Sequence, residues 1–303
     1  MKPSVIILAA MMVAGCTIDR GQDFDVDYKI EFQPAMYMHS APSDVETYPE
    51  SQDFGVSAWV LPEGMYWEDD SEEAEVFAAL SCISCDESGR WKMSDGKGWP
   101  TKYERLTFIA YSPYEELCAC NQTEGIVWTG VDMTKNHTDL LYTEPLEDMC
   151  KMDCGGVVTL PFRHAMCIVD FRIKNRVAED EHIIVKKITM DAVRTKGDFR
   201  SAADPVWSLG DQMSPIVIYE GEYDTDGLPE PIGDERLFIP QGLDTEVTVA
   251  YDYVHVSGSG LVMNLKTVPL KTVLEPGKRY TFTLSVGIDD VKFLTELIED
   301  RIR

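Results

Sequence analysis

Eight cysteines are the side chains of this sequence best suited to chemistry, because thiols form disulfides, bind metal ions and act as nucleophiles. Apart from Cys16 they form three close pairs and one single residue: Cys82 and Cys85, Cys118 and Cys120, Cys150 and Cys154, and Cys167. Structural zinc sites usually combine pairs of regular spacing or add histidines, and the three spacings here all differ. We therefore favour disulfides or free thiols over zinc, with the connectivity open, and expect Cys167 to be a small buried side chain.

Other residue types that often serve in catalysis are scattered along the chain and form no recognisable motif. No GxSxG, HExxH or phosphate-binding glycine loop is present, so we expect neither an enzyme nor a cofactor. The histidines are isolated from one another: His39, His137, His164, His182 and His255. The 53 acidic residues against 27 basic ones give a formal charge of -26, which repels phosphates and argues against nucleic acid as a partner.

The N-terminus predicts export and anchoring. Lys2 precedes an apolar run at 5–13 that is too short to span a bilayer, and small residues come just before Cys16. The pattern resembles a bacterial lipobox, in which residues 1–15 are removed as a signal peptide and Cys16 is acylated. The alternative is an ordinary signal peptide with an incidental cysteine. Acyl chains buried at about 0.8 kcal/mol per CH₂ would anchor the protein to a membrane through a tether at 16–26.

The elements that must position these residues read as β-strands. In the central stretch 160–175, apolar residues alternate with Asp170, Arg172 and Lys174, which is the period of a half-buried strand. Residues 144–156 look like a linker or long loop, and 71–80 fit either a helix or a strand. The remaining predicted strands are 27–32, 54–61, 106–111, 125–129, 139–142, 185–193, 215–219, 237–239, 246–256, 261–273 and 280–286.

Two further patterns concern the C-terminal half. A glycine turn between 246–256 and 261–273 predicts a hairpin, and the short segments with regular turns favour antiparallel sandwiches. Beyond residue 289, apolar residues recur at helical spacing, which predicts a short terminal helix; the alternative is an extension that changes conformation in assembly. The residues in this pattern are Phe293, Leu294, Leu297, Ile298 and Ile302.

Several stretches, taken together and in order, resemble the fimbrillin-like family of Bacteroidota lipoproteins, the subunits of type V pili. The resemblance runs along nearly the whole mature chain. Its pieces are Cys16; Ile30-Glu31-Phe32; the strand from Phe54; Trp99-Pro100 leading to LTFIAYSP at 106–113; LPFRHAMCIVDFRIKN at 160–175; Ile188, Lys196-Gly197 and Trp207; LFIPQ at 237–241; and PGKRYTFTL at 276–284.

The resemblance implies an all-β protein of two transthyretin-like antiparallel β-sandwich domains in tandem, at 27–157 and 158–303. It implies a lipid anchor in the outer membrane through Cys16 and a structural or adhesive role in a pilus at the cell surface. The implied partners are other pilus subunits, joined by donor-strand insertion, together with host or bacterial surface ligands. In the family, an arginine- or lysine-specific protease removes the first strand, and a strand from a neighbouring subunit fills the groove.

The basic residues bear on that processing step. A protease of this kind can cut in the tether at Arg20 or in the first strand at Lys29, but no lysine or arginine follows until Arg90. This absence predicts a subunit that keeps its first strand, such as an anchor or accessory subunit, or a related lipoprotein that does not polymerise. The alternative is that a cut at Lys29, or a different protease, is sufficient.

A second function remains open at this level, that of a surface glycan-binding lipoprotein. Sugar rings stack on exposed aromatic faces, and the chain has six tryptophans. Tryptophans are also ordinary core residues of β-sandwiches, and we favour that interpretation. The six are Trp59, Trp67, Trp91, Trp99, Trp128 and Trp207.

Overall fold

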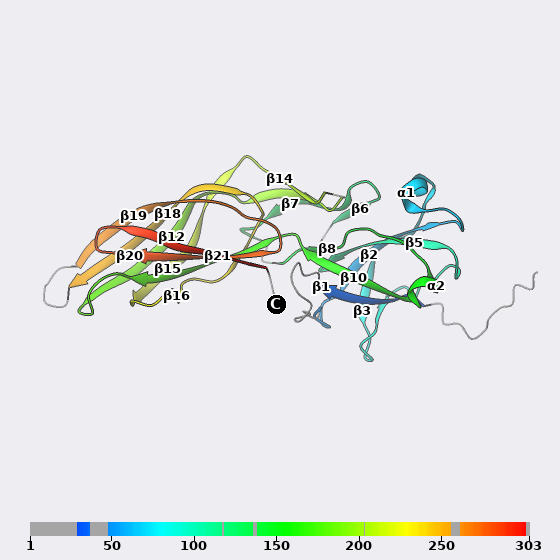
Figure 1. Cartoon of the computed structure of the whole chain (residues 1–303), viewed down its shortest axis with the longest axis horizontal. Coiled ribbons are helices and arrows are strands. Elements are labelled where there is room, and N and C mark those ends of the chain that lie inside the picture. Colours follow the sequence, from blue (N-terminus) through cyan, green and yellow to red (C-terminus); the bar gives the residue numbers. More distant parts are fainter. Residues whose placement is uncertain are drawn as a thin grey trace, which may run out of the picture.

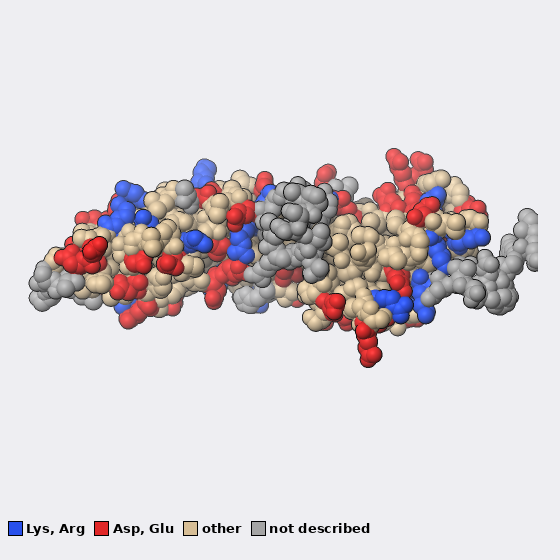
Figure 2. Space-filling view, turned by 60° about the horizontal axis from the view of Figure 1, so that its bottom comes forward, with Lys and Arg blue, Asp and Glu red and all other residues tan. Residues whose placement is uncertain are grey.

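A computed structural model of the chain describes residues 29–36, 48–116, 118–135, 138–202, 204–255 and 261–300. These residues form an elongated molecule with sheets arranged end to end (Figure 1). Strands dominate, and the helical segments are short: α1 (Trp67–Asp70), the 3₁₀ turn Ser71–Glu73 and α2 (Lys151–Cys154). The predicted all-β fold is confirmed. Acidic side chains are spread along the visible face and not gathered into one patch (Figure 2).

The first sheet surrounds the core of the N-terminal half. The first strand in its order, β2, bonds to β5 as well as to β3. The strands from β2 to β5 therefore close around the core, and β9 lies beside β5 outside this ring. In order the strands are β2 (Phe54–Leu61), β3 (Glu75–Cys85), β4 (Trp91–Met93), β1 (Glu31–Met36), β10 (Val157–His164), β8 (Leu141–Tyr142), β5 (Arg105–Ser112) and β9 (Leu146–Met149).

Strand β2 has the predicted bounds and is buried on both faces, because it lies between β3 and β5. Its Gly55 sits opposite Tyr111, and a Cβ at this glycine would be only 2.0 Å from Cε1 of the tyrosine ring. A glycine is therefore required where the aromatic side chain crosses the strand.

Two sheets face each other in the C-terminal half. One contains β16 (Glu230–Pro231), β11 (Cys167–Asn175), β20 (Lys278–Val286) and β21 (Val291–Asp300), with β17 (Arg236–Phe238) also bonded to β11. The other contains β15 (Met213–Thr225), β12 (Glu181–Arg194), β18 (Gly242–His255) and β19 (Leu261–Val273). The predicted hairpin is confirmed, since β18 and β19 pair in continuous antiparallel register.

A smaller sheet lies between the halves and takes strands from both. Its order is β14 (Val206–Leu209), β13 (Lys196–Arg200), β7 (Gly125–Asp132) and β6 (Ala119–Asn121). Phe199 of β13 packs on Trp128 of β7 and on Trp207 of β14, with ring centroids 5.5 and 5.2 Å apart. One buried apolar cluster runs through this sheet into the C-terminal sandwich, and a second fills the N-terminal half.

The central stretch is two strands, where the sequence predicted one. It divides at Ala165 and Met166, both fully buried, so that β10 belongs to the first sheet and β11 to the C-terminal one. The backbone here is bonded on both sides: Ala165 N–H donates to the Leu140 carbonyl at 2.8 Å, and Gly277 N–H donates to the Met166 carbonyl at 3.0 Å. The domain boundary between residues 157 and 158 stays a prediction.

Three local predictions need correction. The predicted C-terminal helix is wrong, because the segment forms β21, whose main chain bonds to the edge of β20 and whose Phe293 packs on Phe282. The predicted loop at 144–156 contains β9 and α2. The ambiguous segment at 71–80 divides into the 3₁₀ turn and the start of β3. Antiparallel pairing predominates as expected, with two parallel exceptions: β1 with β10, and β11 with β20.

Candidate functional site

The first strand, β1, is the element on which assembly would depend. It lies between β4 and β10, parallel to β10 over all six residues and antiparallel to β4 over Glu31 and Phe32. The predicted strand at 27–32 is therefore shifted toward the C-terminus, and Pro34 lies inside it. Proline removes a hydrogen-bond donor and so weakened the strand signal in the sequence.

Two apolar side chains fix β1 to the core. Ile30 is 1% exposed and Phe32 is 3% exposed. The ring of Phe32 makes edge contacts with Phe54 and Phe108, with centroids 6.3 and 5.7 Å apart. Burying each of these side chains contributes about 1.5–3 kcal/mol, so the strand is held by packing as well as by main-chain bonds.

The start of β1 is fixed by backbone bonds on either side. Glu31 N–H donates to the Gly156 carbonyl at 3.1 Å, and Lys29 forms an antiparallel bridge with Gly98. The Glu31 carboxylate lies 3.5 Å from Nη1 of Arg90, in the turn before β4. These contacts come from three separate segments, so β1 cannot leave without breaking all of them.

The residues predicted for lipidation and processing fall at or beyond the start of the described region. Cys16 and Arg20 lie outside the described residues. Lys29 is described, and the bond that follows it leads directly to the buried Ile30. Proteases bind an extended and accessible segment, so cleavage after Lys29 requires β1 to detach first.

The last strand, β21, is held differently. Among the described strands it pairs with β20 alone and so lies at the edge of its sheet. Three of its apolar side chains are about half exposed: Leu294 at 48%, Leu297 at 52% and Ile298 at 52%. An edge strand with exposed apolar side chains offers both main-chain bonds and apolar surface to another molecule.

The cysteines form no disulfide, and all seven that are described are free thiols. Burial raises the pKa of Cys118 to about 12 and that of Cys120 to about 11, so both stay protonated and unreactive near neutral pH. Among the described residues, no three Cys, His, Asp or Glu side chains are grouped to hold a metal ion. Cys167 is fully buried, as expected.

The tryptophans are core residues, which removes the aromatic platform expected of a glycan-binding site. Five of the six are at most 7% exposed, and these are Trp59, Trp67, Trp91, Trp99 and Trp128. The sixth, Trp207, is half-buried and donates from Nε1 to the Ala165 carbonyl at 2.7 Å.

The histidines that can be placed have structural partners. Nδ1 of His164, at the end of β10, lies 2.7 Å from the Asp139 carboxylate, which ties this strand to the loop before β8. His182 contacts Asp224 at 3.1 Å across neighbouring strands. His39 and His137 lie outside the described residues. Within the part of the chain that is described, no helix is long and apolar enough to cross a membrane.

Comparison with known proteins agrees with this architecture. A fimbrial protein from Bacteroides vulgatus ATCC 8482 superposes with a TM-score of 0.70 at 14% identity, over 90% of this chain and 99% of the other. A protein from Bacteroides uniformis ATCC 8492 that is assigned to cell adhesion gives 0.57 at 16% identity, over 90% and 99%. A similar one from Bacteroides ovatus ATCC 8483 gives 0.55 at 14% identity, over 91% and 98%.

At these identities the solved structures establish the fold alone. No curated protein matches the chain. The family model described as fimbrillin-like matches residues 50–300, which is most of the sequence. The chain belongs to the fimbrillin-like family.

Proposed function

We propose that this protein is a surface subunit of a fimbria, anchored in the outer membrane through a lipid on Cys16 and joined to a neighbouring subunit by β-strand exchange. Membership of the fimbrillin-like family and the likeness to a fimbrial protein support a structural or adhesive role. The chain is not an enzyme.

The role within the fimbria follows from the contrast between the two terminal strands. A subunit accepts a donor strand only where its own first strand has left a groove. Here β1 is paired with β10 along its whole length and with β4 over Glu31 and Phe32, and no basic residue stands between Lys29 and Arg90 to release it. We infer an anchor or accessory subunit that keeps β1. It takes part in strand exchange through β21, which is paired along one edge.

The burial of Ile30 and Phe32 at the start of β1 is the observation that carries this proposal, and intact mass with N-terminal sequencing tests it. Protein recovered from its native outer membrane should begin at acylated Cys16. A native chain that begins at Ile30 and runs as a ladder of oligomers would show that β1 is shed, and the anchor role would be wrong.

A designed cleavage site tests the exchange itself. Glu46→Arg places a basic residue after β1, and Glu46→Gln is the matched control without a new site. After trypsin, the Glu46→Arg chain should lose the segment ending at residue 46 and bind intact protein in size-exclusion chromatography. Binding should fail when the intact partner lacks residues 291–303 and persist when it lacks only 301–303. Equal binding by both truncated partners would exclude β21 as the donor.

A further inference from the structure

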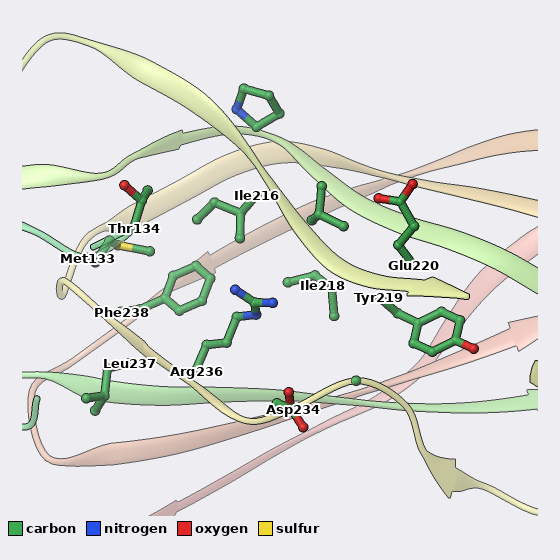
Figure 3. Close-up of a pocket in the computed structure, with 13 residues that line it drawn as sticks. Met133, Thr134, Ile216, Ile218, Tyr219, Glu220, Asp234, Arg236, Leu237 and Phe238 are labelled. Atoms are coloured by element: carbon green, nitrogen blue, oxygen red, sulfur yellow. The ribbon is translucent and has the colours of Figure 1, made fainter. Parts of the chain in front are cut away.

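A pocket opens on the side of the C-terminal sandwich where β15 and β17 end their respective sheets. Its cavity is about 600 Å³, a size typical of small-molecule sites. The apolar side chains Ile216, Ile218 and Phe238 line it and are at most 7% exposed. Figure 3 shows the guanidinium of Arg236 lying in the space between these three side chains.

The position of Arg236 is set by strand register. It lies opposite Val169 in the antiparallel pairing of β17 with β11, and directly opposed residues share a face of the sheet. Val169 is 2% exposed and belongs to the core, so the arginine enters the sandwich from its inner face. The side chain as a whole is half-buried, but its Nε is buried among these apolar side chains.

Arg236 has no partner of its own. Its Nε is buried and makes no hydrogen bond, and no described carboxylate lies within ion-pair distance of the guanidinium. Nearby, Arg279 shows the ordinary arrangement, with Asp170 at 2.9 Å and Glu235 at 2.8 Å. In a chain with a net charge of -26, a half-buried arginine whose Nε is buried and unbonded, with no described carboxylate in ion-pair distance, offers a position for an anionic group.

The surroundings indicate the shape of the missing group. The edge of β15 is obstructed to an added strand, because Pro215 has no N–H and a Cβ on Gly233 would lie 2.4 Å from the Ile218 carbonyl oxygen. The pocket therefore suits a compact ligand better than an extended peptide. Glu220 also lines the pocket but is paired with Lys187 at 2.9 Å, so Asp234 is the remaining acidic group there, and it opposes a doubly charged phosphate more strongly than a singly charged carboxylate.

We propose that this pocket binds a small amphiphilic monocarboxylate, with the carboxylate on the guanidinium of Arg236 and the apolar body on Ile216, Ile218 and Phe238. A planar guanidinium matches a carboxylate in a two-bond fork, and the apolar lining excludes water from the ligand body. The proposal is independent of strand exchange, because it uses neither β1 nor β21.

Calorimetric titration with sodium decanoate below its micelle concentration tests the proposal, on the mature chain carrying Cys16→Ser to avoid the lipid. Arg236→Met should weaken binding by about tenfold to a hundredfold, as expected for the loss of a charge-assisted hydrogen bond. Arg172→Met removes an exposed arginine from β11 and is the matched control, with unchanged binding expected. Decan-1-ol and decyl phosphate should both bind more weakly than decanoate.

A second variant keeps the test decisive if Arg236→Met folds poorly. Thr134→Trp fills the exposed rim of the pocket without touching Arg236, and it should also remove decanoate binding. The proposal is wrong if decanoate does not bind the parent chain, or if Arg236→Met binds it equally well. It is also wrong if a capped acidic tripeptide binds through Arg236 while decanoate does not.

Discussion

The first and last strands of the described chain are stabilised by opposite means. β1 lies inside its sheet, with Ile30 and Phe32 buried and with neighbours on both sides. β21 has a neighbour on one side only and leaves half of several apolar side chains exposed. The difference indicates that the neighbours of a terminal strand, and not its place in the sequence, decide how firmly it is held.

The largest expected change in the free energy of unfolding comes from a substitution in β1, the strand that is anchored in the core. Phe32→Ala removes a ring that packs on Phe54 and Phe108, and it should lower the free energy of unfolding by about 3–5 kcal/mol. Leu297→Ala, on the exposed side of β21, should change it by no more than about 0.5 kcal/mol. Urea denaturation measures both, and similar losses for the two variants would break the comparison.

Amide hydrogen exchange should separate the two strands without any mutation. The amides of β1 that bond to β10 should exchange only with broad unfolding of the first sheet. Those of β21 should exchange about a hundredfold faster, because opening an edge strand exposes little buried surface. Peptide-level mass spectrometry resolves the two regions, and equal protection would contradict the proposed role of β21.

A smaller effect is expected from the charge pair at the start of β1. Glu31→Gln removes the partner of Arg90, whose side chain is 53% exposed, so the loss should stay below about 1 kcal/mol. In 1 M salt the difference should nearly vanish, because exposed charges are screened. A larger loss that is insensitive to salt would mean that packing by the Glu31 side chain, and not its charge, holds the strand.

The smallest effect concerns pH at the start of β21. Hydrogen bonds from Lys292, at 2.9 Å, and from Arg176 lower the pKa of Asp290. A lowered pKa in the folded state stabilises the protein above the ordinary pKa of an aspartate, and this contribution is lost as the pH falls through the lower value. The protection factor at the start of β21, which is corrected for the intrinsic pH dependence of exchange, should therefore fall below about pH 4. Asp290→Asn should remove that dependence, and a persistent fall would assign it to another group.

Local pattern predicted the strands whose environment is simple. Phe54–Leu61 was predicted with its observed bounds because a continuous apolar run suits a strand covered on both faces. The C-terminal segment was predicted as a helix because Phe293, Leu294, Leu297 and Ile298 have helical spacing. The unpaired edge of β20 decides the outcome instead, and no local pattern reveals that edge.

Prediction of the candidate sites from the sequence was limited for the same reason, because local pattern does not show which strands pair. The apolar positions in 160–175 change from even to odd numbers across a continuous apolar run at 165–169, which is compatible with a break but does not reveal that the two strands join different sheets. Arg236 stands between ordinary strand residues, and its pocket appears only when β15, which belongs to the other sheet, lies against β17. Both the change of sheet and the pocket depend on contacts between segments that are far apart in the sequence.

The buried connection at Ala165 and Met166 has a mechanical consequence for the proposed fimbrial role. Leu140, Trp207 and Gly277 bond to this two-residue link from both halves, so it cannot serve as a pivot. A pull along the long axis then passes through β10 and β11, whose parallel neighbours β1 and β20 share the load lengthwise. The hydrogen bonds of these parallel pairs would then be loaded in shear, together and not one after another, and we expect the subunit to resist extension as a stiff rod.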